Sequence, residues 1–293
     1  MGLRHWLGLI LGLSSSLSAM AVAAQPLVVR VPSLDALRGQ NVDLDGQWFA
    51  APAAATAGPA PAMVLMHGCG GQLDRNGHLA ERYTGLADRL NHMGVHVLVL
   101  DSFTSRGVKE VCTQHVGTRP INQQQRRRDA LGALKWLSEQ PQVDKTRLGL
   151  LGWSNGGSTV LAALNMRHPE VAAAGLRPSL AVAYYPGCEA ELQRGFEAST
   201  PLLMLLGESD DWTPAGPCKA LAHQAKSGPP IEWEAYEGAF HGFDGTAPVR
   251  LRRDVPGGVK PGAGVTVGAN PAAREASAAR LTRFLNFHWK LQP

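Results

Sequence analysis

Three side chains that could transfer an acyl group to water lie far apart in the second half of the chain. Ser154 is the central residue of Gly-Trp-Ser-Asn-Gly-Gly (152–157), which has the Gly-x-Ser-x-Gly form of a nucleophile elbow. A serine hydroxyl is a weak nucleophile unless a base takes its proton and a third group orients that base. In folds with such an elbow the acid and then the histidine follow the serine, as Asp210 and His241 do here. We therefore expect Ser154, His241 and Asp210 to form a catalytic triad.

The acid has one alternative within the same loop. Asp210 and Asp211 are adjacent in Gly-Glu-Ser-Asp-Asp-Trp-Thr-Pro (207–214). We favour Asp210 from its position between the glycine and the proline, and we interpret Asp211 as a residue that caps the turn. His241 follows the last strand-like apolar run, and glycines three residues before it and one after it allow the loop to turn the imidazole inward.

Acyl transfer also needs two backbone donors for the oxyanion. We assign the N–H of Asn155, directly after the serine, and the N–H of Cys69 in His-Gly-Cys-Gly-Gly (67–71). His67 opens that loop, and we interpret it as a residue that orients the loop rather than as a second base. The aromatic residues predicted to form the walls of a substrate pocket are Phe103, Trp153, Tyr184 and Trp212.

The elements that must position these residues alternate between apolar runs and amphipathic stretches. Strands are predicted at 27–31, 47–50, 63–66, 95–100, 148–151, 180–185, 202–206 and 231–236. Helices are predicted at 79–93, 122–139, 156–167, 217–225 and 271–289, the last one starting with Asn270 as cap and Pro271 in the first turn. Residues 245–270 are rich in Gly, Pro and Arg and are predicted to be a long excursion before the last helix, which either shapes the mouth of the site or is a plain surface loop. The pattern predicts an α/β fold with a mostly parallel central sheet and helices on both faces.

Length and composition fit one large globular domain. The chain has 293 residues, of which 44% are hydrophobic and 18% charged, with a net charge of +4. We expect residues 25–293 to form a single α/β-hydrolase domain. The only basic run, residues 126–128, opens a predicted helix, and we interpret it as a solvated helix face rather than a nucleic-acid site.

The first 24 residues have the pattern of a signal peptide. Arg4 precedes the apolar stretch 6–13, and small residues follow up to Ala24. The apolar stretch is too short to span a bilayer, so no stable membrane anchor is expected. Cleavage before Gln25 would send the chain to the periplasm or outside the cell.

Four cysteines fit an oxidising compartment, and three pairings are possible. We favour Cys69–Cys112 and Cys188–Cys218, because each pair comes from consecutive loops expected at the same end of the sheet. No closely spaced cysteines or histidines point to zinc, and no metal or other cofactor is expected.

Together these motifs resemble those of the dienelactone hydrolase family of α/β hydrolases, between about residues 60 and 290. The matching motifs are His-Gly-Cys-Gly-Gly (67–71), Asp-Ser-Phe (101–103), the elbow (152–157), the acid loop (207–214) and Phe-His-Gly-Phe (240–243). By this resemblance Ser154, Asp210 and His241 match nucleophile, acid and base, and Cys69 and Asn155 match the oxyanion positions.

The resemblance implies a cofactor-free serine hydrolase that cleaves small carboxylic esters or lactones through an acyl-enzyme. The family's namesake enzymes carry cysteine as nucleophile, and they carry a glutamate near the position of Gly68, where this chain has none. Ester hydrolysis by serine is therefore expected rather than cleavage of dienelactone itself. The alternatives are a serine peptidase of the same fold and a non-catalytic envelope-binding protein on a hydrolase scaffold.

Overall fold

The computed structural model describes residues 26–37, 39–52, 55–56, 58–225 and 228–291, together with Gly2. The predicted signal peptide, residues 1–24, lies outside the described residues apart from that glycine. Among the helices that are described, none is both long and apolar enough to cross a membrane.

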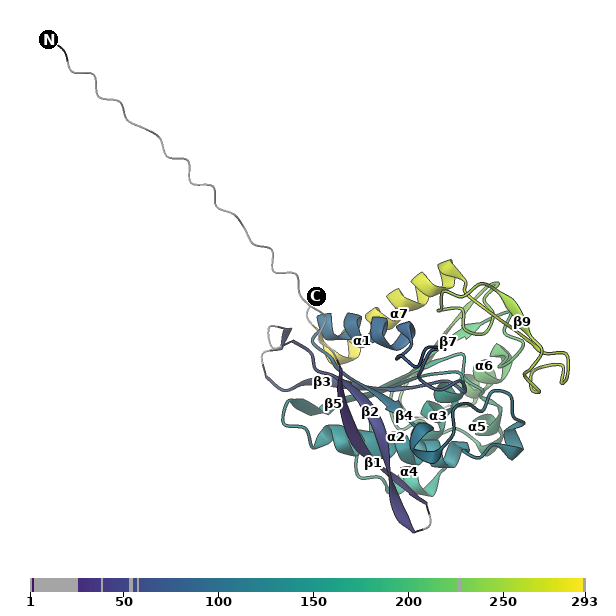
Figure 1. Ribbon diagram of the computed structural model, residues 1–293, viewed down its shortest axis with the longest axis horizontal. Coiled ribbons are helices and arrows are strands. Elements are labelled where there is room, and N and C mark those ends of the chain that lie inside the picture. The colour runs from purple at the N-terminus through teal and green to yellow at the C-terminus, as the bar shows by residue number, and fades with distance from the viewer. Residues whose placement is uncertain are drawn as a thin grey trace.

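One eight-stranded sheet forms the centre of the described structure (Figure 1). Its strands are β1 (Leu27–Leu37), β2 (Gln40–Phe49), β3 (Ala60–Met66), β4 (His96–Asp101), β5 (Val143–Trp153), β6 (Leu180–Tyr184), β7 (Leu202–Gly207) and β8 (Ile231–Tyr236). Their order is β1-β2-β4-β3-β5-β6-β7-β8, and every pair is parallel except the two that include β2. The parallel strands therefore end at one edge of the sheet, which is where sites form in open α/β folds.

Helices cover both faces of the sheet, as the sequence predicts. The α-helices of the described residues are α1 (Glu81–His92), α2 (Gln123–Ser138), α3 (Asn155–Leu164), α4 (Pro169–Ala173), α5 (Glu189–Arg194), α6 (Ala215–Gln224) and α7 (Pro271–Trp289). Figure 1 shows α1 and α7 on one side of the sheet and α2 and α3 on the other. The Asn270 side chain accepts a hydrogen bond from the N–H of Ala273 at 3.1 Å, so the predicted start of α7 is confirmed.

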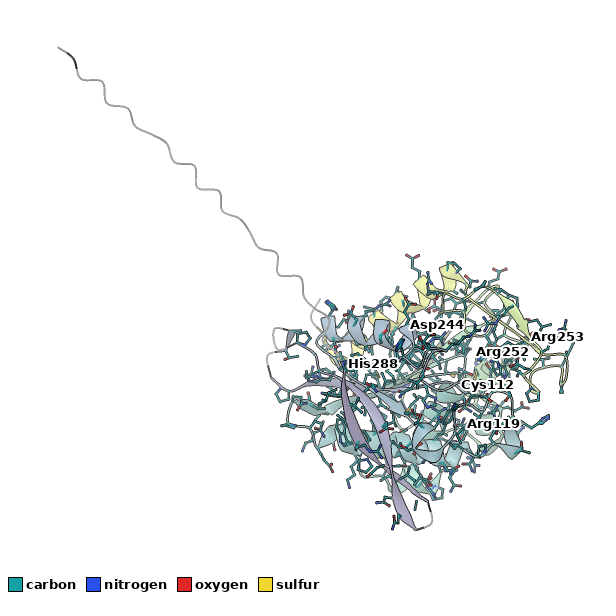
Figure 2. All side chains as sticks on the ribbon, in the orientation of Figure 1. Cys112, Arg119, Asp244, Arg252, Arg253 and His288 are labelled. Atoms are coloured by element: carbon teal, nitrogen blue, oxygen red, sulfur yellow. A yellow bond between two sulfur atoms is a disulfide. The ribbon has the colours of Figure 1, made fainter. Side chains whose placement is uncertain are left out.

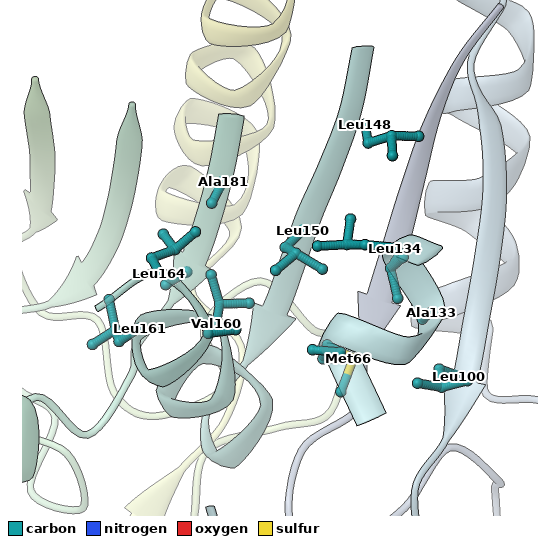
Figure 3. Packing of buried hydrophobic residues seen from close by; sticks show 14 of the residues in the cluster. Met66, Leu100, Ala133, Leu134, Leu148, Leu150, Val160, Leu161, Leu164 and Ala181 are labelled. Atoms are coloured by element: carbon teal, nitrogen blue, oxygen red, sulfur yellow. The ribbon is translucent and has the colours of Figure 1, made fainter. Parts of the chain in front are cut away.

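Alternation along the parallel strands supplies both faces of the core. In β3, Val64 packs with the α2–α3 side and Leu65 packs with the α1–α7 side, and both are fully buried. Figure 3 shows Val160 of α3 beside Leu150 of β5, both members of the same buried cluster. Each fully buried aliphatic side chain of this kind stabilises the fold by about 1.5–3 kcal/mol. This packing on both faces is why the central strands have nearly continuous apolar sequences.

The predicted excursion 245–270 contains a small antiparallel sheet, in which Arg250–Arg252 (β9) pairs with Val265–Val267 (β10). The prediction of a solvated face for the basic run at the start of α2 is wrong, because Arg126 is 0% exposed and Arg127 is 7% exposed. The capping box of Asn122 starts α2 just before this run, and the first turns of α2 lie against neighbouring elements rather than solvent.

Candidate active site

The nucleophile elbow is a tight turn between β5 and α3. Ser154 has φ 53° and ψ −118°, a conformation that costs a non-glycine residue about 1–3 kcal/mol. A Cβ atom on Gly152 would lie 2.3 Å from the carbonyl oxygen of Gly156, and a Cβ on Gly156 would lie 2.1 Å from that of Met66. Only glycine fits at either position, which explains the spacing of the motif.

The structure brings the three predicted triad residues into one hydrogen-bonded chain. Ser154 Oγ lies 2.8 Å from His241 Nε2, and His241 Nδ1 lies 2.8 Å from Asp210 Oδ2. All three residues are buried, with exposures of 9%, 5% and 4%. With a proton on Nδ1 donated to the carboxylate, Nε2 is free to accept the proton of the serine hydroxyl.

The two adjacent aspartates of the acid loop point to different partners. Besides His241, the Asp210 carboxylate accepts hydrogen bonds from the backbone N–H groups of Trp212 and Thr213, both at 2.9 Å. The Asp211 carboxylate accepts from the N–H of Thr266 at 2.7 Å and from its hydroxyl at 2.9 Å. Asp210 therefore holds the imidazole and also makes the turn, whereas Asp211 holds β10.

A second carboxylate ties the histidine loop to the elbow strand. Asp244 Oδ2 accepts from the indole N–H of Trp153 at 2.8 Å, and Asp244 Oδ1 accepts from the Tyr185 hydroxyl at 2.7 Å. Arg82 lies 3.2 Å from the same carboxylate and also bonds the Tyr185 hydroxyl. Burial raises the pKa of Tyr185 well above its usual value, so the phenol remains a donor. Asp244 (Figure 2) is a site residue that the sequence marks only by its place three residues after the histidine.

His67 is hydrogen-bonded on both ring nitrogens to backbone groups, so neither nitrogen serves as a base for the serine. Its Nδ1 donates to the carbonyl oxygen of Gly68 at 2.8 Å, and its Nε2 accepts from the N–H of Ser102 at 3.1 Å. Burial, followed by the positive charge of Arg126, lowers its pKa to about 3. The imidazole is therefore neutral and fixes the start of the 67–71 loop.

The two predicted oxyanion donors flank the serine. Cys69 lies in the 67–71 loop, where a Cβ on neighbouring Gly68 would be 3.8 Å from Ser154 Cβ, and Asn155 is the first residue of α3. Neither of the two backbone N–H groups donates to an acceptor within the described parts of the chain. The predicted disulfides Cys69–Cys112 and Cys188–Cys218 are both confirmed.

Two cavities adjoin this machinery. One of about 490 Å³ has His241, Trp153 and Tyr184 among its walls, and its charged lining residues are Glu81, Arg82, Arg89, Asp244, Arg250 and Arg274. Another of about 570 Å³ lies beside the 67–71 loop and includes Phe103. Trp212 lies beside the imidazole of His241, with ring centroids 4.5 Å apart and the ring planes tilted by 42°. No three metal-ligating side chains gather anywhere in the described ranges.

Comparison with known proteins agrees with this geometry. The model of the "Dienelactone hydrolase family" matches residues 48–288. The structure of a thermophilic esterase from Thermogutta terrifontis is 16% identical, with 92% of this chain and 94% of that chain covered and a TM-score of 0.62. A dienelactone hydrolase-like promiscuous phosphotriesterase from metagenomic libraries is 18% identical, with 90% and 99% covered and a TM-score of 0.62. At these identities the likeness concerns the fold, which is that of α/β-hydrolases.

Proposed function

Because the chain belongs to the dienelactone hydrolase family and is thereby a carboxylic ester hydrolase, we propose that it cleaves small esters or lactones with Ser154, His241 and Asp210 as its catalytic triad. The observation that carries the proposal is the unbroken hydrogen-bonded chain from hydroxyl to imidazole to carboxylate, with both links at 2.8 Å. The strained backbone of Ser154 supports it, because such strain concentrates at functional sites.

The reaction proceeds in two halves. Ser154 Oγ attacks the acyl carbon while His241 Nε2 takes its proton, and the N–H groups of Cys69 and Asn155 stabilise the oxyanion. His241 then protonates the leaving alkoxide, and the acyl group stays on the serine. Water attacks this ester while His241 Nε2 takes its proton, the bond between the acyl carbon and Ser154 Oγ breaks, and His241 returns the proton to the serine as the acid is released. Asp210 accepts from Nδ1 throughout and stabilises the imidazolium.

A fluorophosphonate probe tests the proposal directly. The similar Thermogutta terrifontis esterase 2 has been captured phosphorylated by paraoxon, and a serine activated in the same way here should react with such phosphorus reagents. We expect the purified protein to be labelled and Ser154→Ala not to be labelled. Ser154→Ala should also lower kcat/KM for p-nitrophenyl acetate by about 10⁴-fold or more. Ser158→Ala, one turn further along α3, is the matched control and should still be labelled.

Other outcomes favour the alternatives. An unlabelled wild-type protein would favour a non-catalytic binding protein, and faster cleavage of amides than of short esters would favour a peptidase. We also propose that residues 25–293 form one exported domain, which the two disulfides support. The labelled species should then be found in the periplasmic or secreted fraction, and labelling confined to the cytoplasm would contradict export.

A further inference from the structure

Arg126 is a fully buried cation that makes no ion pair with a carboxylate in the described structure. Its side chain leaves α2 and ends between the two loops that flank Ser154. One guanidinium nitrogen donates to the carbonyl oxygen of His67 at 2.7 Å, and the other donates to Asn155 Oδ1 at 2.5 Å. The guanidinium carbon also lies 5.1 Å from the centre of the Phe103 ring. Arg126 therefore bonds the first residue of the 67–71 loop, which carries the Cys69 donor, and also bonds Asn155, the proposed donor at the start of α3.

The arginines around it are neutralised in the ordinary way. Arg127, the next residue, bonds Glu170 at 2.5 Å. Arg106 bonds the carboxylate of Asp129, with contacts of 2.8 and 2.9 Å. A buried positive charge without a carboxylate partner is unfavourable. The position of Arg126 beside the proposed oxyanion site therefore suggests a functional role for this charge.

We propose that Arg126 is a positioning residue that sets the two oxyanion donors relative to each other and directs its buried positive charge toward the oxyanion. The proposal rests on the proposed function, because it requires an oxyanion at Ser154. Cys69 lies two residues beyond the carbonyl that Arg126 binds, and Asn155 is held by its own side chain. One rigid planar group thus links both donors, which a lysine with a single ammonium cannot do in the same geometry.

The first turn of α2 strengthens the link. Gln123 donates to the backbone carbonyl of Asn155 at 3.1 Å and accepts from the Thr159 hydroxyl at 2.8 Å. The start of α3 is therefore bonded to α2 at three points. Because negative charge appears on the substrate oxygen only in the transition state, loss of Arg126 should lower kcat far more than it changes KM.

The test compares Arg126→Met and Arg126→Lys with Arg127→Met as matched control. Arg127 is the neighbouring arginine, which is 7% exposed and contacts Glu170 but neither the 67–71 loop nor Asn155. We expect Arg126→Met to lower kcat for p-nitrophenyl acetate by about 10- to 100-fold at nearly unchanged KM, with Arg126→Lys in between. A trifluoromethyl ketone, which forms a tetrahedral adduct with the serine, should bind more weakly by a similar factor. Arg127→Met should lower Tm but leave kcat within about twofold.

Rates are normalised to the serine concentration measured by fluorophosphonate titration, so partial unfolding does not imitate the effect. If Arg126→Met does not fold, Arg126→Lys and Asn155→Ala decide by the same criterion, since Asn155→Ala keeps the backbone donor and removes the contact. An unchanged kcat in these variants, or equal loss of affinity for substrate and adduct, would overturn the proposal. An active Ser154→Ala variant would instead contradict the proposed function itself. That result is distinguishable from a failure of the Arg126 proposal, in which Ser154→Ala is inactive but the Arg126 variants keep their kcat.

Discussion

The imidazole of His67 is completely buried and hydrogen-bonded on both nitrogens, so its neutral form is built into the fold. Its pKa is lowered from 6.5 to about 3, first by burial and then by Arg126, against a smaller opposite effect of Asp101. In the unfolded chain the same group takes up a proton below its ordinary pKa. Between these two values the unfolded state binds more protons than the folded state, so the stability of the fold falls as the pH falls.

We therefore expect acid to destabilise the protein well before its carboxylates are protonated. From pH 7 to pH 5 His67 alone should lower the free energy of unfolding by about 2 kcal/mol. Urea unfolding at several pH values measures this slope. His67→Asn, which cannot titrate, should be less stable at pH 7 but should lose less stability on going to pH 5. An identical slope in the variant would show that His67 is not the group responsible.

The β9–β10 arm is attached to the site through the aspartate next to the proposed acid. Asp211 accepts both hydrogen bonds from Thr266, and its backbone carbonyl accepts from the N–H of Val259 at 2.8 Å. On the other strand Arg252 lies over the Trp212 ring at 5.7 Å, and Figure 2 shows Arg252 and Arg253 on this outer arm. The arm therefore packs on the acid loop rather than on the central sheet.

Substitution of the two adjacent aspartates should separate arm stability from catalysis. Asp211→Ala leaves two partly buried donors of Thr266 without their acceptors, and we expect it to loosen the arm and speed tryptic cleavage between Arg250 and Lys260. Its kcat should change by less than about tenfold, since His241 keeps its partner. Asp210→Asn should lower kcat by about 10⁴-fold without changing the rate of tryptic cleavage.

Limited proteolysis and ester turnover on the same samples check both halves of this prediction. Comparable loss of kcat in the two variants would contradict the division of roles. Rapid cleavage of the arm in Asp210→Asn would contradict it as well, because that residue makes no described contact with β9 or β10.

What the sequence could predict at this scale depended on burial. The strands at the centre of the sheet were predictable because both faces are covered, and each is therefore an apolar run bounded by polar or glycine residues. β9 and β10 have only three residues each, too few for a period to appear. The burial of Arg126 was not predictable either, because its acceptors are a carbonyl and an amide from distant loops. The run of three adjacent arginines therefore predicted a solvent-exposed helix face.

Over the molecule as a whole, two disulfides fasten the edge of the sheet where the triad lies. Cys69–Cys112 closes a loop of 43 residues and Cys188–Cys218 one of 30 residues, and the two loops do not overlap. Both pairs were predicted from the expectation that consecutive loops of a parallel sheet share one end. The two disulfides differ in what they contact. Cys69 carries a proposed oxyanion donor, whereas Cys188 and Cys218, the latter in α6, belong to the hydrophobic core.

Removing each disulfide should accordingly have similar effects on stability and different effects on activity. By loop-closure entropy, Cys69→Ser/Cys112→Ser and Cys188→Ser/Cys218→Ser should each lower the free energy of unfolding by up to about 4 kcal/mol. Only the first pair should also lower kcat, because its loop then holds the Cys69 donor less firmly. Urea unfolding measures the loss of stability. The kcat for an ester is measured at a temperature well below the Tm of each variant, so that the protein is folded in the assay. Both disulfides close a loop, but only Cys69–Cys112 belongs to the 67–71 loop that carries a proposed oxyanion donor. An equal loss of kcat in the two variants would therefore mean that the disulfides affect catalysis only through global stability.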